Sequence, residues 1–164
     1  MERYDAIIVG AGPAGLSAAG RLARAGYRVI AVDSGAQPGG QLVKQIHKFF
    51  GSAQVCAGVR GIRLARKLYD EAVSAGCEFL LNAAAYSLDR TEEGYRVLAD
   101  LGERTRVLTG KTVLLALGAS ENALAFPGWT KPGVITAGAA QTLVNLQRVR
   151  VGERVLMVGA GNVG

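Results

Sequence analysis

The sequence has few of the residue types that build disulfide frameworks or metal sites, and this shortage narrows the possible classes of protein. Among its 164 residues there are two cysteines, Cys56 and Cys77, and one histidine, His47. The cysteines stand 21 positions apart, a spacing typical of neither a redox pair nor a zinc site. We therefore expect inert thiols, a cytoplasmic location and no bound metal.

Long apolar runs are missing as well. No stretch approaches the ~18 consecutive apolar residues that a membrane-spanning helix needs. The N-terminus leads straight into a strand pattern, so we expect neither a signal peptide nor a membrane partner. The net charge is +6, and the densest basic group has the spacing of an exposed helix face without interleaved aromatic residues: Arg60, Arg63, Arg66 and Lys67. Nucleic acid is therefore not an expected partner.

Glycine, by contrast, is abundant, with 23 residues that recur at the ends of apolar runs. Residues 5–10 form a short apolar run typical of a strand buried on both faces. A helix is predicted over 13–25, with Pro13 at its start and Gly26 just past its end. A second apolar run, 28–32, completes a strand–helix–strand unit of a parallel sheet.

The remaining segments predict an α/β fold with a small antiparallel meander. Their order is a loop over 34–58, a helix over about 61–75, a strand over 78–82, a meander over 84–90, 95–100 and 104–109, a buried strand over 112–117, a connector over 119–135, a helix over about 137–148 capped by Thr136, and a strand over 154–158.

The clearest motif is the G-x-G-x-x-G sequence of residues 10–15, which lies between the first strand and the first helix. Gly10 suits the tight turn, Gly12 lets a pyrophosphate approach the backbone, and Gly15 lets helix and strand pack closely. Pro13 and Ala14 lie in the first helical turn, whose N–H groups and positive dipole end attract anions.

Asp33 strengthens the prediction of a dinucleotide site. It ends the second strand, 18 positions after Gly15, where a carboxylate accepts hydrogen bonds from an adenosine ribose. A turn-forming role for Asp33 before Ser34 is compatible with that function. A second copy of the motif at Gly159, Gly161 and Gly164 gives the order of enzymes that bind FAD first and a nicotinamide nucleotide second.

Four elements together resemble the pyridine nucleotide-disulfide oxidoreductase superfamily, in the arrangement of thioredoxin reductases. They are residues 10–15 with Asp33, the Gly-Gly-Gln-Leu sequence 39–42, residues 112–119, and the second glycine motif. The resemblance covers the whole chain. It implies a Rossmann-like FAD-binding domain over 1–118, a connector with one helix over 119–152, and the start of an incomplete NAD(P)-binding domain over 153–164.

The same resemblance implies further cofactor contacts. The residues it adds to the FAD site are Ser34 near the ribose, Gly40, Gln41 and Leu42 beside the flavin, Ala85 near the adenine, and Ala116, Gly118 and Ala119 under the cofactor. Leu117 stands where relatives have threonine. Hydride chemistry then belongs to the flavin. No catalytic residue is identified, although His47 or Lys48 could place a proton or charge near the flavin; we favour a plain loop role for His47.

The missing cysteine pair argues against disulfide reduction within this stretch. The connector sequences Phe-Pro-Gly-Trp-Thr (126–130) and Pro-Gly-Val (132–134) resemble a cysteine-poor branch, the flavoprotein subunits of opine oxidases, hydrogen cyanide synthase and sarcosine oxidase. That branch implies an amine, amino acid or NAD(P)H as electron donor, with an iron–sulfur subunit plus an amine-oxidising flavoprotein subunit as partners. Two alternatives stay open: a disulfide reductase with cysteines beyond residue 164, and a non-catalytic nucleotide-binding or docking subunit.

The resemblance also predicts that residues 1–164 are the N-terminal part of a longer enzyme. Members insert the nicotinamide domain into the FAD domain and then return to complete it. We therefore expect this chain alone to bind FAD weakly and to be inactive toward NAD(P)H.

Overall fold

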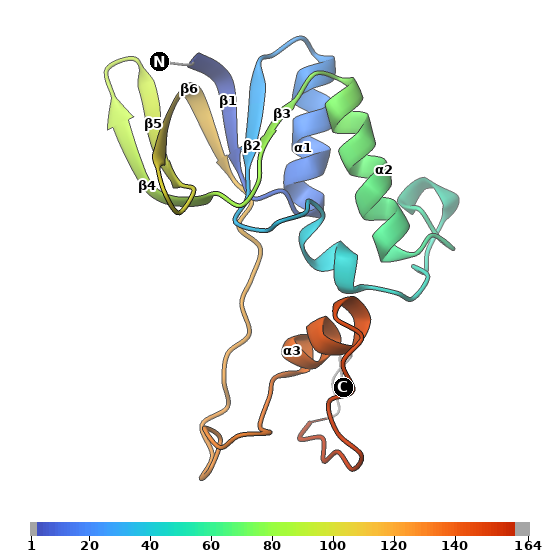
Figure 1. Ribbon diagram of the computed structural model, residues 1–164. Coiled ribbons are helices and arrows are strands. Elements are labelled where there is room, and N and C mark those ends of the chain that lie inside the picture. Colours follow the sequence, from blue (N-terminus) through green and yellow to red (C-terminus); the bar gives the residue numbers. More distant parts are fainter. Residues whose placement is uncertain (1–2, 160–164) are drawn as a thin grey trace. The chain divides into compact units, whose positions relative to one another are not determined.

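The computed structural model describes residues 3–159 and divides the chain into two compact units, Met1–Gly118 and Ala119–Gly164. The first unit is an α/β domain built on one six-stranded sheet of order β3-β2-β1-β6-β5-β4 (Figure 1). Its elements are β1 (Arg3–Val9), α1 (Pro13–Arg24), β2 (Val29–Val32), the 3₁₀ turns η1 (Gly40–Lys44) and η2 (Ala53–Val55), α2 (Gly61–Ser74), β3 (Glu78–Leu80), β4 (Ala84–Thr91), β5 (Gly94–Asp100) and β6 (Thr105–Leu115).

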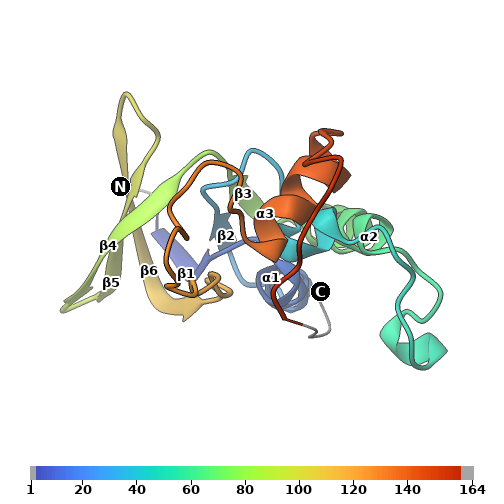
Figure 2. The same cartoon turned by 90° about the horizontal axis from the view of Figure 1, so that it is seen from below.

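The sheet combines a parallel half with an antiparallel half. β3, β2, β1 and β6 pair in parallel, whereas β6, β5 and β4 pair antiparallel. Figure 2 shows β4 and β5 at the end of the sheet away from β3 and both helices. This arrangement confirms the predicted Rossmann-like class, a strand–helix–strand unit followed by a meander.

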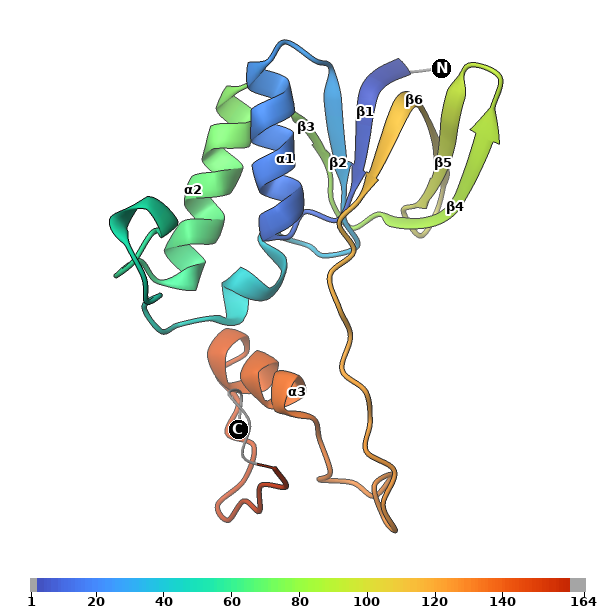
Figure 3. The same cartoon turned by 180° about the vertical axis from the view of Figure 1, so that it is seen from behind.

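Two separate apolar clusters, one on each face of the sheet, explain why the sequences of β1 and β2 are continuous apolar runs. On one face α1 and α2 lie side by side (Figures 1 and 3) and pack small side chains against the parallel strands; the buried residues of this cluster are Ala6, Ile8, Ala19, Ala23, Val29, Ala31, Ala72 and Cys77. The other cluster joins the parallel strands to the meander: Tyr4, Ile7, Val9, Ile30, Val32, Leu80, Ala83, Val97, Ala99 and Leu108. Successive residues of β1 and β2 alternate between the two clusters, so both faces of the central strands are buried.

The prediction of two strands over 104–109 and 112–117 was wrong, because β6 is continuous. Gly110 lies at the junction, aligned with Tyr95 of β5 and Tyr4 of β1. A Cβ at Gly110 would lie 2.9 Å from Cγ1 of Ile7. Glycine therefore marks a close approach inside the sheet and not a break between strands.

The predicted burial of the end of β6 was also wrong. Leu114 and Leu115 are 38% and 59% exposed. The helix-side cluster reaches Ala116, just past the end of β6, but neither apolar cluster includes Leu114 or Leu115. An apolar run therefore predicted the strand correctly and its environment incorrectly.

The predicted helices form close to their expected limits. In α2, Ala65 and Ala72 are buried as expected, whereas Ile62 is 44% exposed. The helix begins at Gly61, as predicted, and Gly61 packs so closely on η1 that a Cβ there would lie 2.7 Å from the carbonyl oxygen of Leu42. The first turn thus contacts η1 through its glycine.

The second unit contains α3 (Ala137–Gln141), which continues into a π-helical turn, η3 (Thr142–Leu146). Thr136 caps it as predicted: its Oγ1 accepts a hydrogen bond from the Ala139 N–H at 3.3 Å. The predicted strand over 154–158 is not formed. The described part of this unit has no other strand with which it could pair, and an unpaired strand has no ladder to stabilise it.

Candidate dinucleotide-binding site

Gly10 and Gly15 shape the turn that joins β1 to α1. Gly10 has a φ of +108°, and a Cβ there would lie 2.2 Å from the carbonyl oxygen of Ala116. A Cβ on Gly15 would lie 1.8 Å from the carbonyl oxygen of Gly10. Both contacts are shorter than any real carbon–oxygen contact, so the protein's own packing requires glycine at these two positions.

Gly12 differs from the other two glycines of the motif. Its φ of −75° is open to any residue, and the nearest atom to an added Cβ would be Cα of Gly40 at 4.0 Å. Neither backbone conformation nor packing within the protein therefore requires glycine here. A side chain at this position would instead occupy space beside the start of α1.

The N-terminus of α1 is open to an anion. Gly12 is the N-cap residue, no side chain caps the helix, and no acidic residue lies in its first turn. Pro13 occupies the first helical position, where its missing N–H costs nothing. Pro13 and Ala14 are exposed. The first-turn N–H groups and the positive end of the helix dipole are thus available to a phosphate.

Asp33 lies beside this turn, at the end of β2. Its Oδ2 accepts a hydrogen bond from the Ala11 N–H at 2.6 Å, and its Oδ1 accepts one from the Gly35 N–H at 2.7 Å. The turn-forming role is therefore present. Each carboxylate oxygen keeps a second lone pair, so the ribose role of Asp33 stays a prediction. Ser34 is exposed next to it.

The Gly-Gly-Gln-Leu sequence packs directly on the glycine turn. The Gly39 N–H donates to the carbonyl oxygen of Ala11 at 2.7 Å. A Cβ on Gly40 would lie 2.9 Å from Cα of Gly12. Leu42 is buried and Gln41 is exposed. The fold thus brings together two motifs that lie about thirty positions apart in the sequence.

The other predicted contact residues have different surroundings. The Ala116 N–H donates to the carbonyl oxygen of Val9 at 2.8 Å, which places Ala116 beside Gly10. Gly118 ends the first unit and Ala119 begins the second. Ala85 lies in β4 at an irregularity in its pairing with β5 and packs against the core, and its contact with adenine stays a prediction.

Sequence reasoning missed the role of Ala11. This residue is fully buried, and both its N–H and its carbonyl oxygen are hydrogen-bonded, to Asp33 and Gly39 respectively. Its position between Gly10 and Gly12 was the only signal in the sequence. Of the second glycine motif, Gly159 has a φ of +105°, whereas Gly161 and Gly164 lie outside the described residues.

The cysteines do not form a redox centre within the part of the chain that the structure describes. Both are free thiols, Cys77 is buried, and burial raises the pKa of the Cys77 thiol to about 11. A thiol with that pKa carries little thiolate at neutral pH. His47 stacks edge-on against Phe49 with ring centroids 5.5 Å apart. Between residues 3 and 159 no cluster of metal-ligating side chains occurs, and no helix is long and apolar enough to cross a membrane.

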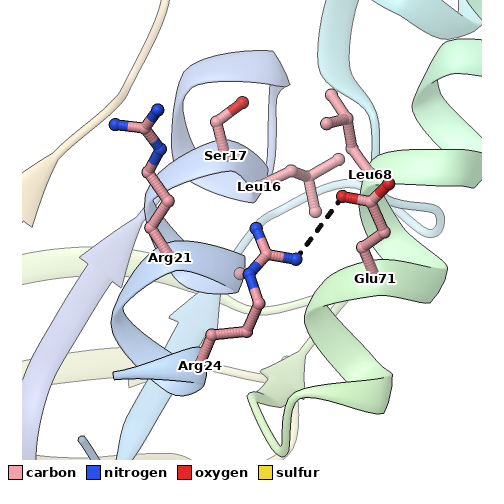
Figure 4. A pocket seen from close by; sticks show the side chains of 7 residues that line it. Leu16, Ser17, Arg21, Arg24, Leu68 and Glu71 are labelled. Carbon is pink, nitrogen blue, oxygen red and sulfur yellow. Dashed lines mark ion pairs between the residues drawn. The ribbon is translucent and has the colours of Figure 1, made fainter. Parts of the chain in front are cut away.

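A shallow hollow of about 140 Å³ lies between α1 and α2 (Figure 4). It is lined by Leu16, Ser17, Gly20, Arg21, Arg24, Leu68 and Glu71, and the Arg24–Glu71 ion pair at 3.6 Å bridges the two helices. A volume below the ~300 Å³ of ordinary ligand pockets leaves no room for a dinucleotide. The hollow is therefore a feature of helix packing and separate from the glycine turn.

The glycine turn, the open helix end and the carboxylate after β2 define the class of the first unit, a dinucleotide-binding α/β domain. Residues 4–164 match the family described as pyridine nucleotide-disulphide oxidoreductase. The chain belongs to that family, as the sequence predicted. FAD is the cofactor of this family, and its thioredoxin-reductase-like members also use NAD(P).

Similar proteins include several oxidase subunits. An opine oxidase subunit from Rhizobium meliloti is 32% identical over 98% of this chain and 31% of its own length. Hydrogen cyanide synthase subunit HcnB of Pseudomonas aeruginosa is 33% identical over 94% and 33%. Thioredoxin reductase of Aquifex aeolicus is 34% identical over 76% and 37%. The chain thus spans about a third of the length of these relatives.

Solved structures share the fold. L-proline dehydrogenase from P. horikoshii superposes with a TM-score of 0.83 at 23% identity, over 92% of this chain and 30% of the other. Thioredoxin reductase from T. acidophilum superposes with a TM-score of 0.65 at 24% identity, over 81% and 42%. At these identities the likeness establishes the fold alone.

Proposed function

We propose that this chain is the FAD-binding part of an FAD-dependent oxidoreductase, and that the β1–α1 turn holds the pyrophosphate of FAD. The residues assigned to FAD are Gly10, Gly12, Pro13, Ala14, Gly15, Asp33, Ser34, Gly40, Gln41, Leu42, Ala85, Ala116, Gly118 and Ala119. When bound, FAD supplies the hydride-transfer chemistry, and the protein binds and orients it.

The observation that carries this proposal is the contrast among the three glycines of the turn. Packing accounts for Gly10 and Gly15, whose side-chain carbons would collide with protein backbone. Packing does not account for Gly12, whose side chain would have room. A ligand phosphate close to the backbone at the start of α1 supplies the missing reason, because any side chain there would keep the phosphate from the N–H groups.

Different groups of the chain would bind different parts of FAD. The N–H groups of the first turn of α1 would donate to the pyrophosphate, and the helix dipole would favour its negative charge. Asp33 would accept from the ribose through its remaining lone pairs. The loop that carries Gly40 and Gln41 lies against Gly12, so it would extend the binding surface from the phosphates toward the flavin.

We further propose that the whole enzyme oxidises an amine or amino acid within a multi-subunit complex. The support comes from relatives named opine oxidase, sarcosine oxidase and hydrogen cyanide synthase subunits, each similar over nearly the whole chain. The partners would be an iron–sulfur subunit together with an amine-oxidising flavoprotein subunit. NAD(P)H is the alternative electron source, and Gly159, Gly161 and Gly164 would begin its binding site.

The similarity to thioredoxin reductases supports a second candidate, a disulfide reductase. It would need a cysteine pair outside this chain, because Cys77 is buried and held as a thiol. Anaerobic reduction of the whole enzyme by NADPH, followed by addition of a disulfide substrate, separates the two: disulfide turnover supports the reductase, and flavin reduction by amines supports the oxidase. Bound nucleotide without turnover would support a non-catalytic module.

The test of the proposed site compares Gly12→Ala with Gly20→Ala. Gly20 lies in the same helix, and a Cβ there would meet only ordinary contacts from 3.5 Å outward. Because the open space at Gly12 accepts a methyl group, Gly12→Ala should lower stability by about 1 kcal/mol or less, the cost of alanine at an N-cap. We expect it to weaken FAD binding at least about tenfold, while Gly20→Ala binds as the original chain does.

Binding is measured by quenching of flavin fluorescence on titration with the chain, and folding by circular dichroism. Equal FAD affinity in Gly12→Ala and the unsubstituted chain would contradict the placement of the pyrophosphate at this turn.

A further inference from the structure

The carboxylate of Asp33 links two loops that belong to different parts of the site. Its Oδ2 accepts from Ala11, in the turn between β1 and α1, at 2.6 Å. Its Oδ1 accepts from Gly35, in the loop after β2, at 2.7 Å. Hydrogen bonds to an ionised carboxylate are shorter and about twice as strong as those between neutral groups. Asp33 therefore makes the strongest side-chain contact to the glycine turn among the hydrogen bonds described for it.

The backbone of Asp33 is itself fixed to the sheet. Its N–H donates to the carbonyl oxygen of Leu80 at 2.9 Å, and its carbonyl oxygen accepts from the Ala83 N–H at 2.9 Å. The carboxylate thus projects from a rigid strand end and not from a mobile loop. A rigid base is what a side chain needs if it is to hold a neighbouring turn in one conformation.

The N–H that donates to Asp33 belongs to Ala11, the residue immediately before the N-cap of α1. Ala11 is fully buried, and its carbonyl oxygen accepts from the Gly39 N–H at 2.7 Å. The peptide groups around Ala11 are therefore held from two sides, by the end of β2 and by the loop before η1. Gly12 follows directly, so these contacts set the direction in which the first N–H groups of α1 point.

We propose that Asp33 is a positioning residue that holds the glycine turn in its phosphate-binding conformation, in addition to any contact with the ribose. This inference rests on the proposed function, in which the turn binds pyrophosphate. Without the carboxylate, the N–H of the buried Ala11 loses its partner and the turn can relax. Part of the binding free energy of a phosphate ligand is then used to order the turn, so the ligand binds with lower affinity.

The two roles of Asp33 predict different ligand dependence. If Asp33 only contacts the ribose, its substitution lowers the affinity only of ligands that carry ribose hydroxyls. If Asp33 holds the turn in place, its substitution lowers the affinity of every ligand that carries the diphosphate. The probes are ADP and 2′,3′-dideoxy-ADP, which share the diphosphate and differ in the two hydroxyls. Binding of both is measured by isothermal titration calorimetry on the 164-residue chain.

The variants are Asp33→Asn, Asp33→Glu and the control Asp100→Asn. Asn keeps the size of the side chain but can accept only through one atom. Glu keeps the charge, but its extra methylene displaces the carboxylate from the two N–H groups. Asp100 forms the same kind of turn, with its Oδ1 accepting from the Gly102 N–H at 2.9 Å, and lies in β5 outside the glycine turn.

We expect Asp33→Asn and Asp33→Glu to weaken the binding of 2′,3′-dideoxy-ADP about tenfold and the binding of ADP by at least as much, while Asp100→Asn leaves both affinities unchanged. In ¹⁵N-labelled chain the amide proton of Ala11, deshielded by the carboxylate, should move upfield in both variants, a change that general destabilisation does not produce. Weakened ADP with unchanged 2′,3′-dideoxy-ADP, or no weakening of either, would overturn the inference. If the unsubstituted chain bound neither nucleotide, the proposed function would fail first and the inference with it.

Discussion

At the scale of single residues, the glycine motif separates into two positions where the fold requires glycine and one where it does not. Gly10 and Gly15 contact backbone oxygens so closely that no side chain fits. Gly12 has an ordinary φ and open surroundings. The geometry supports the packing roles predicted for Gly10 and Gly15, whereas the pyrophosphate role predicted for Gly12 stays a prediction. That role is the basis of the proposed FAD site.

Gly15→Ala tests the packing role. Because the new Cβ would lie 1.8 Å from the Gly10 carbonyl oxygen, either the turn or α1 must shift. We expect the free energy of unfolding to fall by about 3 kcal/mol, within the upper range for overpacking. Urea denaturation followed by circular dichroism measures it, with Gly12→Ala as the matched control. A loss no larger than that of Gly12→Ala would show that the close contact is not rigid.

Cys77 gives a prediction for pH dependence. Burial raises the pKa of its thiol from 9.0 to about 11, so between these values the folded state holds a proton that the unfolded state has lost. Stability from this group is complete below pH 9 and declines as the pH rises toward 11. The slope of unfolding free energy against pH over that window should be shallower in Cys77→Ala. Equal slopes in the two proteins would mean that the thiol titrates normally.

At the scale of elements, β6 holds the two halves of the sheet together. It pairs parallel with β1 and antiparallel with β5, and Gly110 lies where both pairings meet. Its apolar second half led to the prediction of a separate buried strand. The sequence does not encode which neighbours a strand receives, so its continuity and its exposed leucines appeared only in the fold.

Gly110→Val tests whether that junction is tight. A Cβ there would lie 2.9 Å from Cγ1 of Ile7, a side-chain atom that can move only partly within a filled core. We expect a loss of about 1–3 kcal/mol in unfolding free energy despite the higher strand propensity of valine. Chemical denaturation measures the change, and a neutral or stabilising effect would show that the cluster around Ile7 can rearrange.

At the scale of the whole molecule, the sequence predicted those features that depend on local chemistry. The glycine turn, Pro13 at the helix start, Thr136 as a cap and the meander all follow from short-range rules. Features that depend on distant contacts were not predictable: the exposure of Ile62, the single strand β6, and the double hydrogen bonding of Ala11. The strand expected over 154–158 failed for a related reason, because pairing needs a partner strand.

The two glycine motifs lie in different units of the chain. The first unit carries the glycine turn, Asp33 and the Gly40 loop on one continuous sheet. The second begins at Ala119, and the second glycine motif lies at its far end in sequence. The proposed FAD pyrophosphate site therefore needs only the first unit, whereas reduction by NAD(P)H would require the second motif.

The most direct test is a titration of the ¹⁵N-labelled chain with FAD, followed by the backbone amide resonances. We expect saturable changes that are largest at Gly12, Ala14 and Gly15 and smaller at Asp33 and Gly40, with binding weak enough that the bound and free resonances average. Changes centred instead on Leu68 and Glu71, in the hollow between α1 and α2, with the glycine turn unaffected, would contradict the proposed site.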